Sequence, residues 1–91
     1  MAIETATVSS EGQFTTPRQW IGTIVVSVQG LKDGVVLLER SRDNVTFYTT
    51  DLITEDLEAN AFAPGNTLQD YYRLRLIKKN FSGDVELAVG N

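Results

Sequence analysis

The sequence predicts an all-β protein, a single antiparallel β-sandwich or jelly-roll-like domain of about 7–8 short strands. The first observation is that apolar residues recur at period two, as Tyr72, Leu74 and Leu76 do. This alternation is typical of strands with one buried face. The second observation is that Gly, Asn, Asp and Pro interrupt these segments about every ten residues, which is typical of a sandwich or a jelly roll.

The strands follow in chain order from the alternating segments and the turns between them. Turn residues such as Lys32-Asp33-Gly34 and Ser82-Gly83-Asp84 separate neighbouring segments. Most connections are therefore about two to six residues long, as hairpins require. Only the stretch 51–61 would tolerate a single helical turn. We expect strands near 3–9, 13–16, 21–29, 35–42, 45–52, 59–63, 70–78 and 84–90.

A sandwich needs two facing apolar layers, and the alternation predicts which residues form them. The same alternation directs a second set of aliphatic residues outward, namely Val25, Val35, Leu37 and Ile77. Single exposed apolar residues are normal on a protein surface, but several together also fit a protein–protein contact. The predicted core residues are Ile24, Val26, Val28, Val36, Leu38, Phe47, Tyr72, Leu74, Leu76, Val85, Leu87 and Val89.

The length of 91 residues leaves room for one domain. We expect residues 1–12 to form an N-terminal arm or edge strand and residues 13–91 to form the sandwich. The first residues resemble no secretory signal, and the apolar runs are too short to cross a membrane. The net charge is −4, so the chain lacks the basic footprint of a nucleic-acid partner.

The composition argues against an enzyme. The chain contains neither Cys nor His, which excludes disulfides, thiolate and imidazole catalysis, and zinc sites built from these ligands. We therefore expect no catalytic residue, no metal site and no cofactor. The acidic residues Asp51, Glu55, Asp56 and Glu58 do not have the spacing of a calcium loop, and a solvated acidic loop is the favoured interpretation.

The basic residues allow two interpretations. Arg73 and Arg75 alternate on one predicted strand and are followed by Lys78 and Lys79, while Arg40 and Arg42 end another strand. If the two strands are neighbours, these cations form a stripe that could dock onto an acidic partner. In the simpler interpretation they keep the sheet soluble and pair across strands with Glu39 and Glu86.

Two aromatic residues complete the set of candidates. Trp20 follows Pro17 at the start of a predicted strand, where the rim of the core is the favoured position. Phe81 lies in a turn, where it could either anchor a partner or cap the end of the sandwich. The candidate partner-contact residues are Val25, Val35, Leu37, Ile77, Arg73, Arg75, Trp20 and Phe81.

The order of short motifs along residues 22–90 carries a resemblance to a known class of proteins. An aliphatic strand is followed by LLERS at 37–41, DNVTF at 43–47, YYRLRL at 71–76 and SGDVEL at 82–87. This order resembles the small β-sandwich virion proteins of tailed bacteriophages. Two departures are Asn44-Val45 in place of a Gly-rich turn and Phe47 where Trp is common.

The resemblance implies a structural protein of the virion, made in the host cytoplasm. It first implies a capsid decoration (cement) protein that binds the assembled major capsid protein or other virion proteins. It also implies that the chain could assemble into a homodimer or a homotrimer. The alternative is a fibre or tail module that binds a receptor or a carbohydrate. A cement protein should have a flat, partly apolar face. A carbohydrate module should instead expose Trp20, Phe81 or Tyr71 beside a shallow polar groove.

Overall fold

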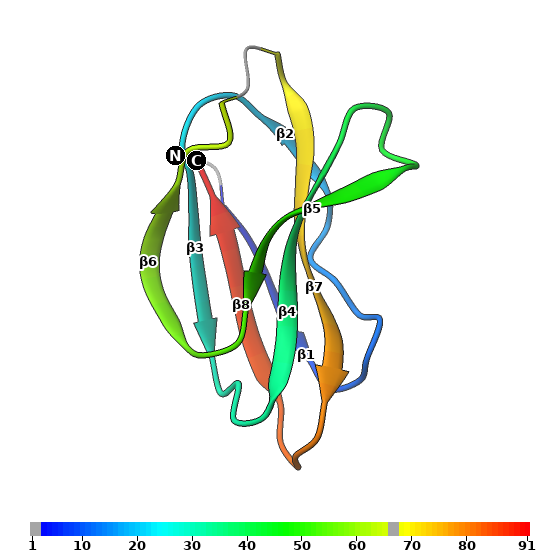
Figure 1. Cartoon of the computed structure of the whole chain (residues 1–91), viewed down its shortest axis with the longest axis vertical. Helices are drawn as coiled ribbons and strands as arrows, with labels where there is room; N and C mark the ends of the chain where they lie inside the picture. Colours follow the sequence, from blue (N-terminus) through cyan, green and yellow to red (C-terminus); the bar gives the residue numbers. More distant parts are fainter. Residues whose placement is uncertain (1–2, 66–67) are drawn as a thin grey trace.

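The computed structural model describes residues 3–65 and 68–91, which form eight strands and no helix (Figure 1). Nothing in these residues is therefore a helical membrane span. Residues 3–8 of the expected arm or edge strand form the edge strand β1. The strands are β1 (Ile3–Val8), β2 (Arg18–Trp20), β3 (Ile24–Gln29), β4 (Gly34–Ser41), β5 (Phe47–Ile53), β6 (Leu57–Phe62), β7 (Asp70–Lys79) and β8 (Val85–Gly90).

The strands form two antiparallel four-stranded sheets, as the alternating pattern predicts. One sheet has the order β1-β8-β3-β6, and the other has the order β2-β7-β4-β5. Each sheet therefore joins strands that are far apart in the sequence; β1, for example, pairs with β8 over its whole length. In Figure 1, β6, β3 and β8 lie to the left of β4 and β7. Ile3, at the start of β1, lies opposite Gly90, at the end of β8.

The core lies between the two sheets. All the predicted core residues except Phe47 are buried, because each occupies the inward position of an alternating strand. Four further residues complete the core, and the periodicity did not identify them because they lie at strand ends or in connections. They are Val8, Trp20, Leu31 and Ile53.

The predicted strand at 13–16 is wrong. Phe14 forms only an isolated bridge to Arg75, and the regular strand begins after Pro17, at Arg18. Here the chain passes from the first sheet to the second along the edge of β7. The Thr15 amide donates to the carbonyl of Leu74, and the buried Thr15 hydroxyl accepts from the Leu74 amide.

The helical turn allowed within 51–61 is also absent. Residues 51–53 end β5, and β6 begins at Leu57 rather than at the predicted residue 59. The carboxylate of Asp56 accepts hydrogen bonds from the amides of Gly30 and Leu31. This side chain therefore ties the connection between β5 and β6, which crosses from one sheet to the other, to the β3–β4 turn.

Candidate partner-binding face

Five of the eight candidate residues gather on the outer surface of the β2-β7-β4-β5 sheet. They lie on β4 and β7, which pair from Gly34 and Lys79 to Ser41 and Tyr71. Leu37 lies opposite Arg75, and Glu39 lies opposite Arg73. We call this surface the β4–β7 face, and its residues are Phe14, Val35, Leu37, Glu39, Phe47, Leu52, Arg73, Arg75 and Ile77.

A buried carboxylate organises the charges of this face. The side chain of Glu39 is only 4% exposed, although it lies on the outer side of its sheet. Arg75 binds it with two parallel hydrogen bonds, Nε to Oε1 and an Nη to Oε2, both 3.1 Å long. Arg73 donates from Nε to Oε1 at 2.8 Å. Bidentate guanidinium–carboxylate contacts are among the stronger and more directional ion pairs, so both arginines are held in place.

Two aromatic rings enclose Arg73. Its guanidinium carbon lies 4.2 Å from the ring centre of Phe14 and 3.8 Å from that of Phe47. This arrangement explains why the core assignment of Phe47 is wrong. Phe47 lies opposite Ser41 on the outer side of β5, where its ring stacks on an arginine and is half-buried.

The aliphatic residues of the β4–β7 face are less exposed than the alternation suggests. Leu37 is buried yet lies outside the core between the sheets, and Val35 and Ile77 are half-buried. Leu37 lies opposite Arg75, and long arginine side chains can cover apolar surface with their methylene groups. Leu52, opposite Leu37, is 63% exposed and forms the open apolar part of the face.

The other three candidates do not belong to this face. Val25 is half-buried on β3 in the opposite sheet. Trp20 is a buried core residue at the end of β2, so its ring is not presented to a partner. Phe81 is half-buried against the core, and the Nζ of Lys79 lies 4.7 Å from its ring centre and donates to its carbonyl.

The structure favours the simpler interpretation of the basic residues. The strands that carry them are neighbours, but Arg73 and Arg75 pair with Glu39 instead of forming an open cationic stripe. The expected pairing with Glu86 does not apply to them, because Glu86 lies in the other sheet. Arg40 and Arg42 both face the buried carboxylate of Asp70, a residue that the sequence analysis did not identify.

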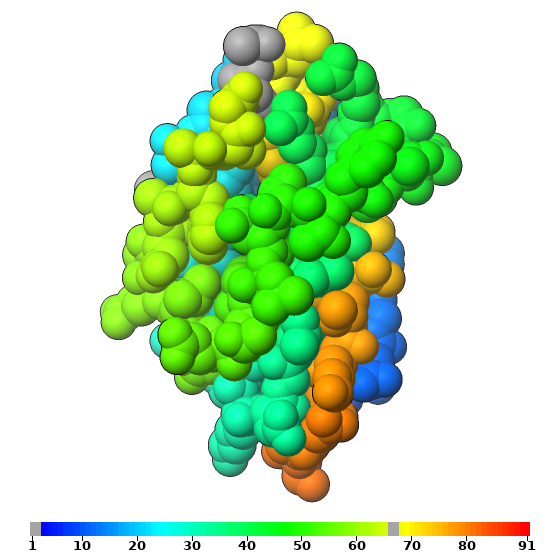
Figure 2. Space-filling view, in the orientation of Figure 1, coloured from blue at the N-terminus to red at the C-terminus, as the bar shows by residue number. Residues whose placement is uncertain are grey.

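The turn of the β4–β5 hairpin is held by its own polar groups. The Oδ1 atom of Asp43 accepts hydrogen bonds from the amides of Val45 and Thr46 and from the hydroxyl of Ser41. Asn44 adopts a left-handed conformation with φ of 61°, which Asn tolerates well. The hairpin projects at the upper right of Figures 1 and 2, and Val45 in its turn is 80% exposed.

The hydrogen bonds from Thr46, Val45 and Ser41 hold the pKa of Asp43 below its ordinary value of 3.8. Because the pKa is lowered by folding, Asp43 stabilises the hairpin above about pH 4 and loses this contribution as the pH falls through the lowered pKa. We expect a carboxyl ¹³C titration to give Asp43 a pKa below 3.8, and a value at or above 3.8 would contradict the hydrogen-bonded turn.

The opposite sheet carries a different kind of surface. A groove of about 520 Å³ runs over the outer side of β1, β8 and β3. Its lining has no aromatic side chain and includes Thr5, Thr7, Ser27, Gln29, Glu86 and Ala88.

The acidic residues between 51 and 58 do not converge. Asp56 caps the β3–β4 turn, and Glu55 and Glu58 are exposed. Among residues 3–65 and 68–91, no three acidic side chains lie close enough together to hold a metal ion.

Leu52 of the β4–β7 face, and Tyr48 and Asp70 beside Arg40 and Arg42, were not among the residues predicted from the sequence. The sequence around the aromatic and acidic residues gave no indication of these roles, because the side chains that they face lie on other strands.

A search of protein-family models, of curated proteins and of solved structures finds no match to this chain.

Proposed function

We propose that the chain is a structural protein of a tailed-phage virion, a decoration protein that binds the assembled capsid shell through the β4–β7 face. The observation that carries the proposal is the cluster of Glu39, Arg73 and Arg75, in which both arginines pair with the carboxylate and the Arg73 guanidinium also lies against the rings of Phe14 and Phe47. The three side chains of this cluster are paired with one another, and exposed side chains of Phe14 and Leu52 belong to the same face.

Such a cluster is suited to burial against another protein. Arg73 and Arg75 already satisfy the Glu39 carboxylate, so a partner does not have to supply the counter-charge for this residue. Side chains that are ordered before binding also lose little conformational entropy when the complex forms. The aromatic and arginine content is typical of the residues that contribute most to protein–protein contacts.

The strand pairing supports a jelly-roll connectivity. Strand β1 pairs with β8, β2 with β7, β3 with β6, and β4 with β5, as if one long hairpin were rolled into two sheets. Jelly rolls occur in viral capsid proteins and in lectins. The fold is therefore compatible with both classes of function, and the choice between them rests on the surfaces.

The test uses shells of the parent phage that lack the decoration protein. We expect the purified chain to co-sediment with these shells, and Leu52→Asp to weaken binding at least about tenfold because it places a carboxylate in an apolar contact. Ile3→Asp is the matched control, since Ile3 is a similarly exposed apolar residue in the other sheet. Absence of co-sedimentation, or equal binding by both variants, would contradict the proposal.

The second candidate function is a fibre or tail module that binds a carbohydrate. It is favoured by the groove on the β1-β8-β3 surface, whose hydroxyl and amide groups suit a polyhydroxylated ligand. The lack of aromatic residues in its lining and the burial of Trp20 count against it. Binding on a glycan array that is lost in Gln29→Ala and retained in Leu52→Asp would favour this function instead.

A further inference from the structure

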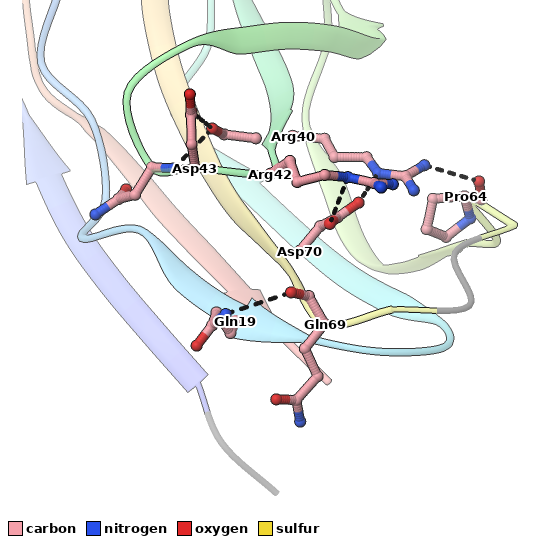
Figure 3. Close-up of polar contacts among 9 residues, drawn as sticks. Gln19, Arg40, Arg42, Asp43, Pro64, Gln69 and Asp70 are labelled. Atoms are coloured by element: carbon pink, nitrogen blue, oxygen red, sulfur yellow. Dashed lines mark hydrogen bonds and ion pairs between the residues drawn. The ribbon is translucent and has the colours of Figure 1, made fainter.

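We infer that the end of the sandwich beside the β4–β5 hairpin holds a binding site for a carboxylate monoanion, with Arg42 as its main contact. This inference goes beyond the proposed function and does not depend on it. Two guanidinium groups, those of Arg40 and Arg42, face the one buried carboxylate of Asp70 (Figure 3). Their charges sum to +1, so one positive charge at this position has no counter-ion within the group.

The two arginines are not equivalent. Arg40 donates from Nε to Asp70 at 2.6 Å and from an Nη to the carbonyl of Pro64 at 3.3 Å, so it is held inside the end of the sandwich. The Nε of Arg42 is 3.7 Å from Asp70, which is too long for a hydrogen bond. The side chain of Arg42 is 70% exposed, and its guanidinium donates no hydrogen bond to the described residues. Arg42 therefore carries the excess charge with its donors directed to solvent or a ligand.

The β4–β7 face provides an internal comparison. There too, two arginines share one buried glutamate, but Arg75 makes a bidentate contact and Arg73 is enclosed by two Phe rings. Neither arginine is as exposed as Arg42. Both sites therefore have two arginines and one carboxylate. On the β4–β7 face both arginines make close contacts with other side chains, whereas beside the hairpin Arg42 remains exposed.

A pocket of about 290 Å³ lies beside these groups, lined by Arg40, Arg42, Tyr48, Thr50 and Asp70. The Thr50 hydroxyl already donates to the carbonyl of Leu38. Apart from the two arginines, the Tyr48 hydroxyl is therefore the lining side-chain donor that can join the Arg42 guanidinium around an anion. A planar guanidinium and a hydroxyl match the oxygens of a carboxylate.

The charges favour a monoanion over a dianion. One bound carboxylate balances the excess charge of the two arginines, whereas a second negative charge would be repelled by Asp70 in the pocket wall. The ligand class is therefore a small carboxylic acid or an exposed carboxylate group, supplied by an acidic amino acid or by an acidic sugar.

The test is an NMR titration of the ¹⁵N-labelled full chain at constant ionic strength. The Arg42 Nε–Hε signal is followed in every protein that contains Arg42, and the backbone amide signals of residues 40–50 are followed in all variants, including Arg42→Gln. The probes are acetate, N-acetyl-L-glutamate amide and D-glucuronate, with chloride and inorganic phosphate for comparison. We expect a saturable shift with the carboxylates in the millimolar range, and the tighter of the amino-acid and sugar probes identifies the source. Arg42→Gln should weaken binding at least about tenfold, and Tyr48→Phe should weaken it less.

The control variant is Arg18→Gln, which removes another exposed arginine and its contact with Glu4. It should leave carboxylate binding unchanged, and thermal melting should show that all the variants are folded. The inference is overturned if the shift does not saturate, if chloride reproduces it, if phosphate binds more tightly than acetate, or if Arg42→Gln binds as well as the wild type.

Discussion

Replacing Leu74 by Ala is expected to lower the free energy of unfolding by about 2–5 kcal/mol. Leu74 is completely buried on β7, which pairs with both β2 and β4 and so lies within its sheet. Its side chain belongs to the core between the two sheets, and the neighbouring strands are tied to it by backbone hydrogen bonds and cannot close the cavity that Ala would leave. A loss of this size is a large part of the stability of so small a domain.

The measurement is urea unfolding followed by Trp20 fluorescence, since Trp20 is buried in the same core. The matched control is Leu52→Ala, the same substitution at an exposed position on β5 of the same sheet. It should change the free energy of unfolding by less than about 0.5 kcal/mol. Equal unfolding midpoints for Leu74→Ala and the wild type would mean that the inward face of β7 is wrongly assigned.

Replacing Glu39 by Ala is expected to cost about 2–4 kcal/mol, because it leaves Arg73 and Arg75 side by side without a counter-charge. The carboxylate is almost completely buried and accepts three hydrogen bonds from the two guanidinium groups. The loss should fall short of that for a fully buried ion pair, since 35% of the Arg75 side chain is exposed to water.

A double-mutant cycle separates this effect from a general loss of packing. If Glu39 and Arg75 stabilise each other, the double variant Glu39→Ala with Arg75→Ala should lose less than the sum of the two single losses. Glu39→Gln should be milder than Glu39→Ala, because the amide oxygen still accepts a hydrogen bond from an arginine. Additive losses, or a Glu39→Ala protein as stable as the wild type, would show that the carboxylate does not hold the face together.

Residues 24–29 and 70–79 show how far the sequence by itself determined this protein. In both segments the period of the apolar residues identified the strand and its buried side, because side-chain direction alternates along any extended chain whatever its partner is. The absence of Cys and His likewise excluded whole classes of chemistry without reference to a fold. The all-β class, most strand positions and most of the core follow from these local properties.

Phe47, Glu39 and Asp70 show what only the tertiary structure decided. Phe47 lies outside the core because its partner is an arginine of β7, and Glu39 and Asp70 are buried because arginines from distant positions converge on them. Which strands become neighbours depends on the packing of the whole chain, and it has no counterpart in the spacing of residues along one segment. For that physical reason the strands could be predicted from their own residues, while the β4–β7 face and the pocket beside Arg42 came only from which strands pair in the β2-β7-β4-β5 sheet.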